Sequence, residues 1–271
     1  KKIPLFFAIP TTSGTGSETT VAAVITDSET HHKASINDPA ILPKYAILDP
    51  ELTKGLPPFV TATTGMDALC HAVEAYTNHT YNTKLEDQLA KDAVKLIHDN
   101  LLVAYQDGSN LEARQNMQRA SFYAGRAFTR GCVGYVHAVG HTLGGLYGVA
   151  HGLAMSIILP HVMRQFGPAV YDKLADLADV CELGGRTNEE KANNFIAWIE
   201  QLKADMDAPI CPDSGKFIVS FMKHRETGRD YVMLVNRNYN KEVTGTFHLR
   251  SDITHLYNCT GGAYDELDIS S

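Results

Sequence analysis

Carboxylate and imidazole side chains recur at helical spacing in the middle of this 271-residue chain. Asp67 and His71 lie four residues apart, His137 and His141 repeat that interval, and His151 follows fourteen residues after His137. Residues four apart share one face of a helix, and fourteen residues are nearly four helical turns. A continuous helix would keep His151 beside His137, and a tight bend between them would do so as well.

These side chains suit a divalent metal ion. Imidazoles in an apolar segment need polar partners, because an unpaired buried polar group costs about 1–3 kcal/mol, and one ion satisfies several of them at once. We predict Asp67, His71, His137 and His151 as ligands, a set that suits Fe(II), Zn(II), Mn(II) or Co(II). For His141 three interpretations stay open: a fifth ligand, a proton-relay base or a core residue. The apolar neighbours are Val133, Val136, Val139, Leu143, Leu146 and Val149.

Two simpler interpretations compete with this one. A single His-x-x-x-His pair on an apolar helix is more often a hydrogen-bonded pair of core residues than a metal site, and the second pair, with its aspartate, is what favours metal. A zinc hydrolase of the His-Glu-x-x-His type would need a glutamate directly after the first histidine. Position 138 is Ala, so this class of hydrolase ranks low.

Composition narrows the possible partners. The net charge is −7 and no run of Lys or Arg stands out, so we expect no nucleic-acid partner. No apolar run is long enough for a bilayer span, and we expect a soluble, cytoplasmic protein with no membrane partner. The segment Lys1–Phe7 is too short for a signal peptide, and we predict a short buried strand there. Five cysteines, an odd number without a Cys-x-x-Cys pair, argue against a disulfide framework.

The sequence pattern divides the chain into three stretches, and the elements that must position the histidines belong to the middle one. Residues 1–58 contain short runs of strand-forming residues, residues 59–209 have helical periodicity, and residues 210–271 contain short β-prone runs separated by turn residues. We therefore predict a mainly α fold. In it an all-helical metal-binding domain follows a few short strands and precedes a short β-meander tail.

Helix signals in the middle stretch are local and specific. One helix is predicted by apolar residues at i, i+3, i+4 and i+7 from Met66, and Asn110 is a candidate N-cap for another that runs to about Arg130. Pro168 suits the first turn of a helix that would end at Gly184-Gly185. A further helix is predicted by the capping box that begins at Thr187.

Several of these stretches together resemble the iron-containing (group III) alcohol dehydrogenases. The resemblance covers residues 3 to about 208 in order. The matching segments are Ile9–Glu18, Leu56-Pro57-Pro58, Gly65–Glu74, Val136–Gly152 and Leu159–Arg164. The tail, 210–271, does not match this family and loosely resembles the C-terminal β domains of bacterial glycoside hydrolases.

The resemblance implies roles for individual residues. Asp67, His71, His137 and His151 match the metal ligands of the family, with Fe(II) as the expected ion and Zn(II) as the alternative, and His141 matches a histidine beside the substrate and nicotinamide. The expected NAD(P)-binding residues are Thr11, Thr12, Thr15, Lys33 and Val60. Without the resemblance, Thr11–Ser17 would be an ordinary Gly-rich turn, since it lacks the third glycine of a dinucleotide fingerprint.

The implied activity is hydride transfer between a small alcohol or aldehyde and NAD(P), and the resemblance also implies a possible homodimer. The sequence departs from the family in two ways: it contains no Gly-Gly-Gly-Ser phosphate loop, and β-prone residues stand where helices should continue after Pro209. We therefore expect residues 1–58 to be remnant strands of a dinucleotide-binding α/β domain and residues 210–271 to be a foreign fragment. The alternative is a metal-binding fragment joined to a carbohydrate-binding or structural β module, without dehydrogenase activity.

Overall fold

The structure, a computed structural model, describes residues 4–27, 33–78, 80–147 and 149–206, and after them only short strand segments. Side chains at positions 26, 33, 35 and 145–147, and all side chains after 206, lie outside the described part. The described helices are α1 (Pro58–Thr77), α2 (Lys84–Gln106), α3 (Leu111–Gly131), α4 (Tyr135–Tyr147), α5 (His151–Phe166), α6 (Tyr171–Val180) and α7 (Asn188–Asp205), with 3-10 turns η1 (Ser17–Thr19), η2 (Pro39–Ile41), η3 (Pro50–Leu52) and η4 (Gly167–Ala169).

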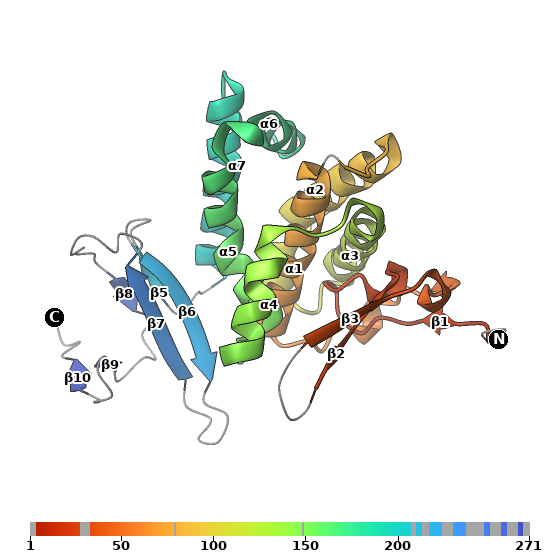
Figure 1. Ribbon diagram of the computed structural model, residues 1–271, viewed down its shortest axis with the longest axis horizontal. Helices are drawn as coiled ribbons and strands as arrows, with labels where there is room; N and C mark the ends of the chain where they lie inside the picture. Colours follow the sequence, from red (N-terminus) through yellow and green to blue (C-terminus); the bar gives the residue numbers. More distant parts are fainter. Residues whose placement is uncertain are drawn as a thin grey trace.

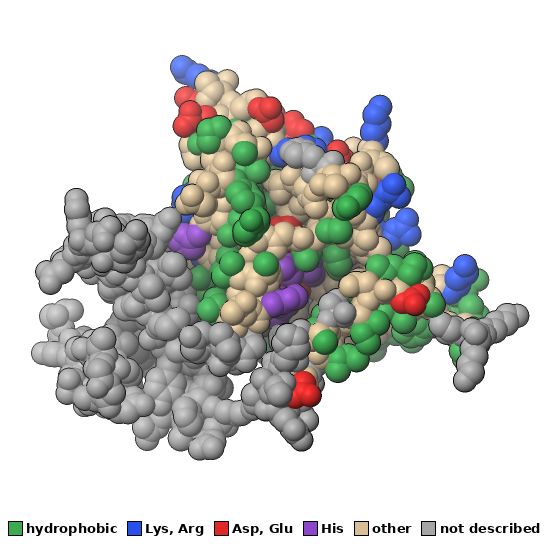
Figure 2. Space-filling model, in the orientation of Figure 1, with side chains coloured by type: hydrophobic (Ala, Val, Ile, Leu, Met, Phe, Trp, Pro, Cys, Tyr) green, Lys and Arg blue, Asp and Glu red, His purple; other side chains and the backbone are tan. Residues whose placement is uncertain are grey.

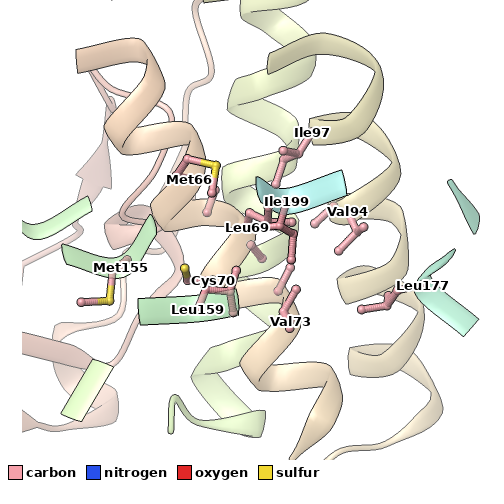
Figure 3. Packing of buried hydrophobic residues seen from close by; sticks show 14 of the residues in the cluster. Met66, Leu69, Cys70, Val73, Val94, Ile97, Met155, Leu159, Leu177 and Ile199 are labelled. Atoms are coloured by element: carbon pink, nitrogen blue, oxygen red, sulfur yellow. The ribbon is translucent and has the colours of Figure 1, made fainter. Parts of the chain in front are cut away.

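Helix α1 is the centre of the helical part (Figure 1). Pro58 occupies its first turn, where the missing N–H costs nothing, and every residue from Gly65 to Tyr76 is buried. Such a helix needs neighbours on all sides. Helices α2, α3 and α5 are its main neighbours, and Figure 3 shows buried side chains of α1 in one core with those of α2, α5, α6 and α7. The labelled members of this core are Met66, Leu69, Cys70, Val73, Val94, Ile97, Met155, Leu159, Leu177 and Ile199.

Two of the predicted helix starts are confirmed, whereas Pro168 lies in η4, before the start of α6 at Tyr171. The Asn110 side chain accepts a hydrogen bond from the N–H of Ala113 at 3.0 Å and begins α3, and Thr187 accepts one from Glu190 N–H at 3.1 Å and begins α7. The predicted end at Gly184-Gly185 is wrong, because α6 already stops at Val180. The chain leaves the helix through Glu182, whose φ of 58° cannot continue a right-handed helix.

The strands before α1 form two small pairs. β1 (Phe7–Ala8) pairs in parallel with β4 (Tyr45–Ala46), and β2 (Ala22–Thr26) pairs antiparallel with β3 (Lys33–Asn37). The prediction of a buried strand in Lys1–Phe7 is wrong for the described residues, 4–7. Leu5 is 64% exposed, and Phe6 and Phe7 are exposed as well, because no described segment covers them.

Short strand pairs are described in the tail as well. β6 (Phe217–Lys223) pairs antiparallel with β7 (Asp230–Asn236), β5 (Ile210–Pro212) with β8 (Phe247–Leu249), and β9 (Leu256–Asn258) with β10 (Asp265–Leu267).

The mainly α fold class with short strands before the helices is confirmed. Among the described helices, none combines the length and the apolar character that crossing a membrane requires.

Candidate metal centre

Three helices deliver the predicted ligands to one place. Asp67 and His71 lie one turn apart in α1, His137 lies in the first turn of α4, and His151 is the first residue of α5. The chain therefore bends between α4 and α5, which resolves the choice between a bend and a continuous helix. Histidine side chains gather near the centre of the face shown in Figure 2, bordered by hydrophobic ones.

The distances fit a single ion. The Oδ1 atom of Asp67 lies 3.3 Å from Nε2 of His151, 3.6 Å from Nε2 of His137 and 3.9 Å from Nε2 of His71. Two atoms that each bond one ion at about 2.1 Å lie at most about 4.2 Å apart. Asp67, His137 and His151 also offer ligand atoms that all lie within 4.8 Å of one another. His71 meets the distance to Asp67 but lies outside this group of three.

Two buried atoms at this place need a partner that the described protein part does not supply. Oδ1 of Asp67 and Nε2 of His137 are shielded from solvent and have no hydrogen-bond partner among the described residues. Burial alone would raise the pKa of Asp67, but the imidazoles of His71, His137 and His151 outweigh it and hold this pKa well below its usual range. An ionised carboxylate facing imidazole nitrogens in a buried pocket fits a divalent cation.

The ring of His71 is positioned by the Gly-rich loop, Thr11–Ser17. Its Nδ1 lies 3.2 Å from the carbonyl oxygen of Gly14, and its ring stacks on that of His137 with centroids 4.6 Å apart. Burial lowers the pKa of His71 to about 4, so the imidazole is neutral at physiological pH. A neutral ring that donates Nδ1–H to Gly14 has its Nε2 lone pair free, as a metal ligand requires.

His137 is held by a carboxylate that the sequence analysis missed. Its Nδ1 lies 2.5 Å from Oε2 of Glu74, a buried residue of α1. Burial lowers the pKa of His137, but the neighbouring carboxylates of Asp67 and Glu74 outweigh it and raise this pKa to about 9. One signal was available: Asp67, His71 and Glu74 follow i, i+4, i+7 spacing, so they share one face of α1.

Three of the predicted cofactor residues, Thr11, Thr12 and Thr15, belong to the Gly-rich loop before η1. Thr11 and Thr15 are exposed, and Thr12 and Val60 are half-buried. Their placement leaves Thr11 and Thr15 accessible to a ligand. Lys33 belongs by its backbone to β3, and its side chain lies outside the described part.

A polar face of α3 fixes this loop, and this face was also missed. Ser121 Oγ accepts a hydrogen bond from Gly16 N at 3.3 Å, Thr129 donates one to the carbonyl of Thr19 at 2.9 Å, and the Gln118 amide donates to the carbonyl of Asp49 at 3.0 Å. Gln118, Ser121, Gly125 and Thr129 follow one another at intervals of three, four and four residues, so they share one face of α3. Gly125 permits the close approach of Gly16. A small and polar stripe at this spacing was the sequence signal.

His141 borders the three-ligand group without belonging to it. Its ring centroid lies 5.1 Å from that of His151 and 5.8 Å from that of His137. The side chain is half-buried, and His151 beside it is 34% exposed. A molecule that reaches the ligand group from solvent would therefore pass next to His141.

Comparisons with known families agree with this arrangement. Residues 61–210 match the Fe-containing alcohol dehydrogenase family, C-terminal, and residues 1–50 match the iron-containing alcohol dehydrogenases. Together these matches cover most of the chain up to the β-rich tail.

Individual relatives match the same part. The 1,3-propanediol dehydrogenase of Klebsiella pneumoniae is 44% identical over 209 residues, which are 76% of this chain and 54% of that protein. A crystal structure of a 1,3-propanediol oxidoreductase superposes with a TM-score of 0.74 at 43% identity, over 77% of this chain and 55% of the other. Sulfoacetaldehyde reductase from Bifidobacterium kashiwanohense in complex with NAD+ gives a TM-score of 0.66 at 34% identity, over 74% and 51%. The chain spans about half the length of the relatives it matches.

Proposed function

Because the chain belongs to the iron-containing alcohol dehydrogenase family, we propose that it is a metal-dependent, NAD(P)-linked oxidoreductase of small alcohols and aldehydes. The observation that carries the proposal is a pair of buried atoms, Oδ1 of Asp67 and Nε2 of His137, which lie 3.6 Å apart and have no hydrogen-bond partner among the described residues. Burying such atoms unpaired is costly, and a divalent ion between them removes that cost.

The proposed ligands are Asp67, His71, His137 and His151, with Fe(II) as the expected ion and Zn(II) as the alternative. One carboxylate and three neutral imidazoles would leave a divalent ion with a net positive charge. When bound, such an ion would supply Lewis-acid chemistry that lowers the pKa of an alcohol hydroxyl, and a nicotinamide would supply the hydride acceptor or donor.

The remaining residues supply position and proton transfer in this proposal. His141 would accept the hydroxyl proton at an imidazole nitrogen, because its half-buried ring lies 5.1 Å from that of the proposed ligand His151. The loop that contains Thr11, Thr12 and Thr15 binds NAD(P), together with Lys33 and Val60. The loop is fixed by α3 and joined to the ligand group through Gly14 and His71. We also propose the division into 1–58, 59–209 and 210–271.

The test compares two aspartates. Asp67→Asn removes the carboxylate from the ligand group, whereas Asp99→Asn removes one from an exposed pair with His98, 2.8 Å away. We expect the wild-type chain and the Asp99 variant to hold one Fe(II) or Zn(II) per chain by elemental analysis, and the Asp67 variant to hold none. We also expect 1,3-propanediol, butanol or ethanol to produce NADH or NADPH, measured at 340 nm, in the same two proteins.

Two results would contradict parts of the proposal separately. An ion bound by the wild-type chain without any alcohol-dependent NAD(P)H formation would leave a metal-binding fragment and remove the dehydrogenase. A wild-type chain that binds no stoichiometric ion would remove both.

A further inference from the structure

Glu74 is a buried carboxylate with two specific partners. It is 4% exposed, in the interior of α1. Its Oε1 accepts a hydrogen bond from the backbone N–H of Val136 at 2.7 Å, and its Oε2 lies 2.5 Å from Nδ1 of His137. Both contacts reach the first turn of α4, so a single side chain of α1 holds the start of the next ligand-bearing helix.

The contact with Oε2 determines which nitrogen of His137 is available. A carboxylate only accepts hydrogen bonds, so Nδ1 must carry a proton and donate it to Glu74. Nε2 then points the other way, toward Oδ1 of Asp67 at 3.6 Å. Without Glu74, the ring would lose the group that sets its rotation and its tautomer.

The contact with Oε1 places the backbone around His137. The first N–H groups of a helix have no partner within the helix, and a negative charge near them is favourable. A Cβ atom at Gly134 would lie 3.1 Å from Oε1 of Glu74, so glycine leaves room for the carboxylate. The same side chain therefore sets both the ring of His137 and the backbone that carries it.

We propose that Glu74 is a positioning residue of the metal site, which holds His137 with Nε2 directed at the ion and thereby sets the affinity of the site. This inference rests on the proposed function. Partners of this kind behind a ligating histidine typically contribute 10- to 100-fold in metal affinity. Glu74 is not itself a proposed ligand, because its two oxygens contact Val136 and His137 of α4.

A glutamine at this position cannot replace the carboxylate. Both partners of Glu74 are N–H donors, and a glutamine side chain has one acceptor oxygen and one donor amide. In Glu74→Gln one of the two partners would face the NH₂ group. Either the N–H of Val136 or the Nδ1–H of His137 would then lose its acceptor.

Glu86 provides a matched control. It is also a buried glutamate that holds the start of a helix: its Oε2 accepts from the N–H of Thr83 at 2.9 Å and from the Thr83 hydroxyl at 2.5 Å. It contacts no predicted ligand among the described residues. Glu86→Gln therefore reports the effect of weakening a buried cap without altering the metal site.

The experiment measures Co(II) binding to the full chain. Competition with a chelator gives the affinity, and the visible d–d absorption reports the geometry of the ligands. We expect Glu74→Gln to lower the affinity 10- to 100-fold with a shifted absorption spectrum, and Glu86→Gln to keep both while lowering the thermal midpoint. An affinity of the Glu74 variant within twofold of wild type, or an equal loss in both variants, would overturn the inference.

A second measurement works without any ion. In the metal-free chain a hydrogen bond as short as that between His137 and Glu74 gives a downfield Nδ1–H proton resonance, which ¹⁵N-histidine labelling and its loss in His137→Gln identify. We expect this signal in wild type and in the Glu86 variant but not in Glu74→Gln. Its absence from wild type would overturn the inference. Its presence in a wild-type chain that binds no Co(II) would instead contradict the proposed metal site, and with it the effect of Glu74 on affinity.

Discussion

Replacing Gly14 by alanine should disturb the metal centre from a distance. Gly14 lies against the backbone of α1, and a Cβ atom built on it would come within 2.5 Å of the carbonyl oxygen of Thr64. Atoms in normal contact lie about 3.5–4.0 Å apart. The loop would therefore have to retreat by roughly 1 Å, because the carbonyl of Thr64 is part of the helix and cannot move alone.

This displacement of the loop lowers the free energy of unfolding in two ways. Forcing a methyl group into a packed site costs about 1–3 kcal/mol. In addition, the Gly14 carbonyl, now 3.2 Å from Nδ1 of His71, would pass beyond hydrogen-bond distance. A buried donor left without its acceptor costs about 1–3 kcal/mol more. We therefore expect Gly14→Ala to lower the free energy of unfolding by about 2–6 kcal/mol and to weaken metal binding, since His71 is a proposed ligand.

Gly55→Ala is the control, because nothing lies within 4 Å of its added Cβ. Urea denaturation of the metal-free chain measures stability, and Co(II) titration measures the affinity of the site. Equal unfolding midpoints and equal affinities for the two variants would refute the reasoning, since they would show that the loop and α1 do not pack as described.

Three further predictions concern other parts of the described structure. The pKa of His71 is lowered by burial to about 4, so between pH 4 and about 6.5 the unfolded chain binds more protons than the folded one. The metal-free chain should lose up to about 3 kcal/mol as pH falls through this window, and urea midpoints of His71→Asn should show a smaller slope. Burial raises the pKa of Cys181 to about 12, so its thiolate fraction at pH 8 is roughly a thousandfold below that of an ordinary thiol; peptide mass spectrometry should find the exposed Cys132 alkylated by iodoacetamide before Cys181. In Gly152→Ala the added Cβ would overlap the carbonyl oxygen of Thr63, so the first turn of α5 should shift and Co(II) affinity fall at least tenfold relative to Gly55→Ala.

The local part of this architecture could be predicted from the sequence. Apolar spacing from Met66 predicts α1, and the polar side chains of Asn110 and Thr187 predict the starts of α3 and α7. Each signal acts within one or two turns, where helical geometry fixes which residues are neighbours. The same geometry pairs Asp67 with His71, because residues four apart lie on one face of a helix.

What the sequence left open depends on contacts between distant segments. Glu74 and His137 are 63 positions apart, and Gly14 and His71 are 57 apart. No periodicity within one helix predicts such partners. The end of α6 was also missed. The helix ends at Val180, and Glu182, a non-glycine residue with positive φ, turns the chain away before the two glycines expected to end the helix.

The arrangement of the proposed ligands implies that ion binding and folding are linked. The ligands belong to α1, α4 and α5, so one ion would join three helices. Two of the ligands also depend on another segment for orientation, through Gly14 at His71 and Glu74 at His137. An ion that binds only the folded chain stabilises it by about 2.7 kcal/mol at a concentration of one hundred times Kd. Urea denaturation with and without Co(II) at that ratio should therefore differ by this amount in wild type. At the same Co(II) concentration Asp67→Asn should show no difference, because it lacks the carboxylate on which the three imidazoles converge.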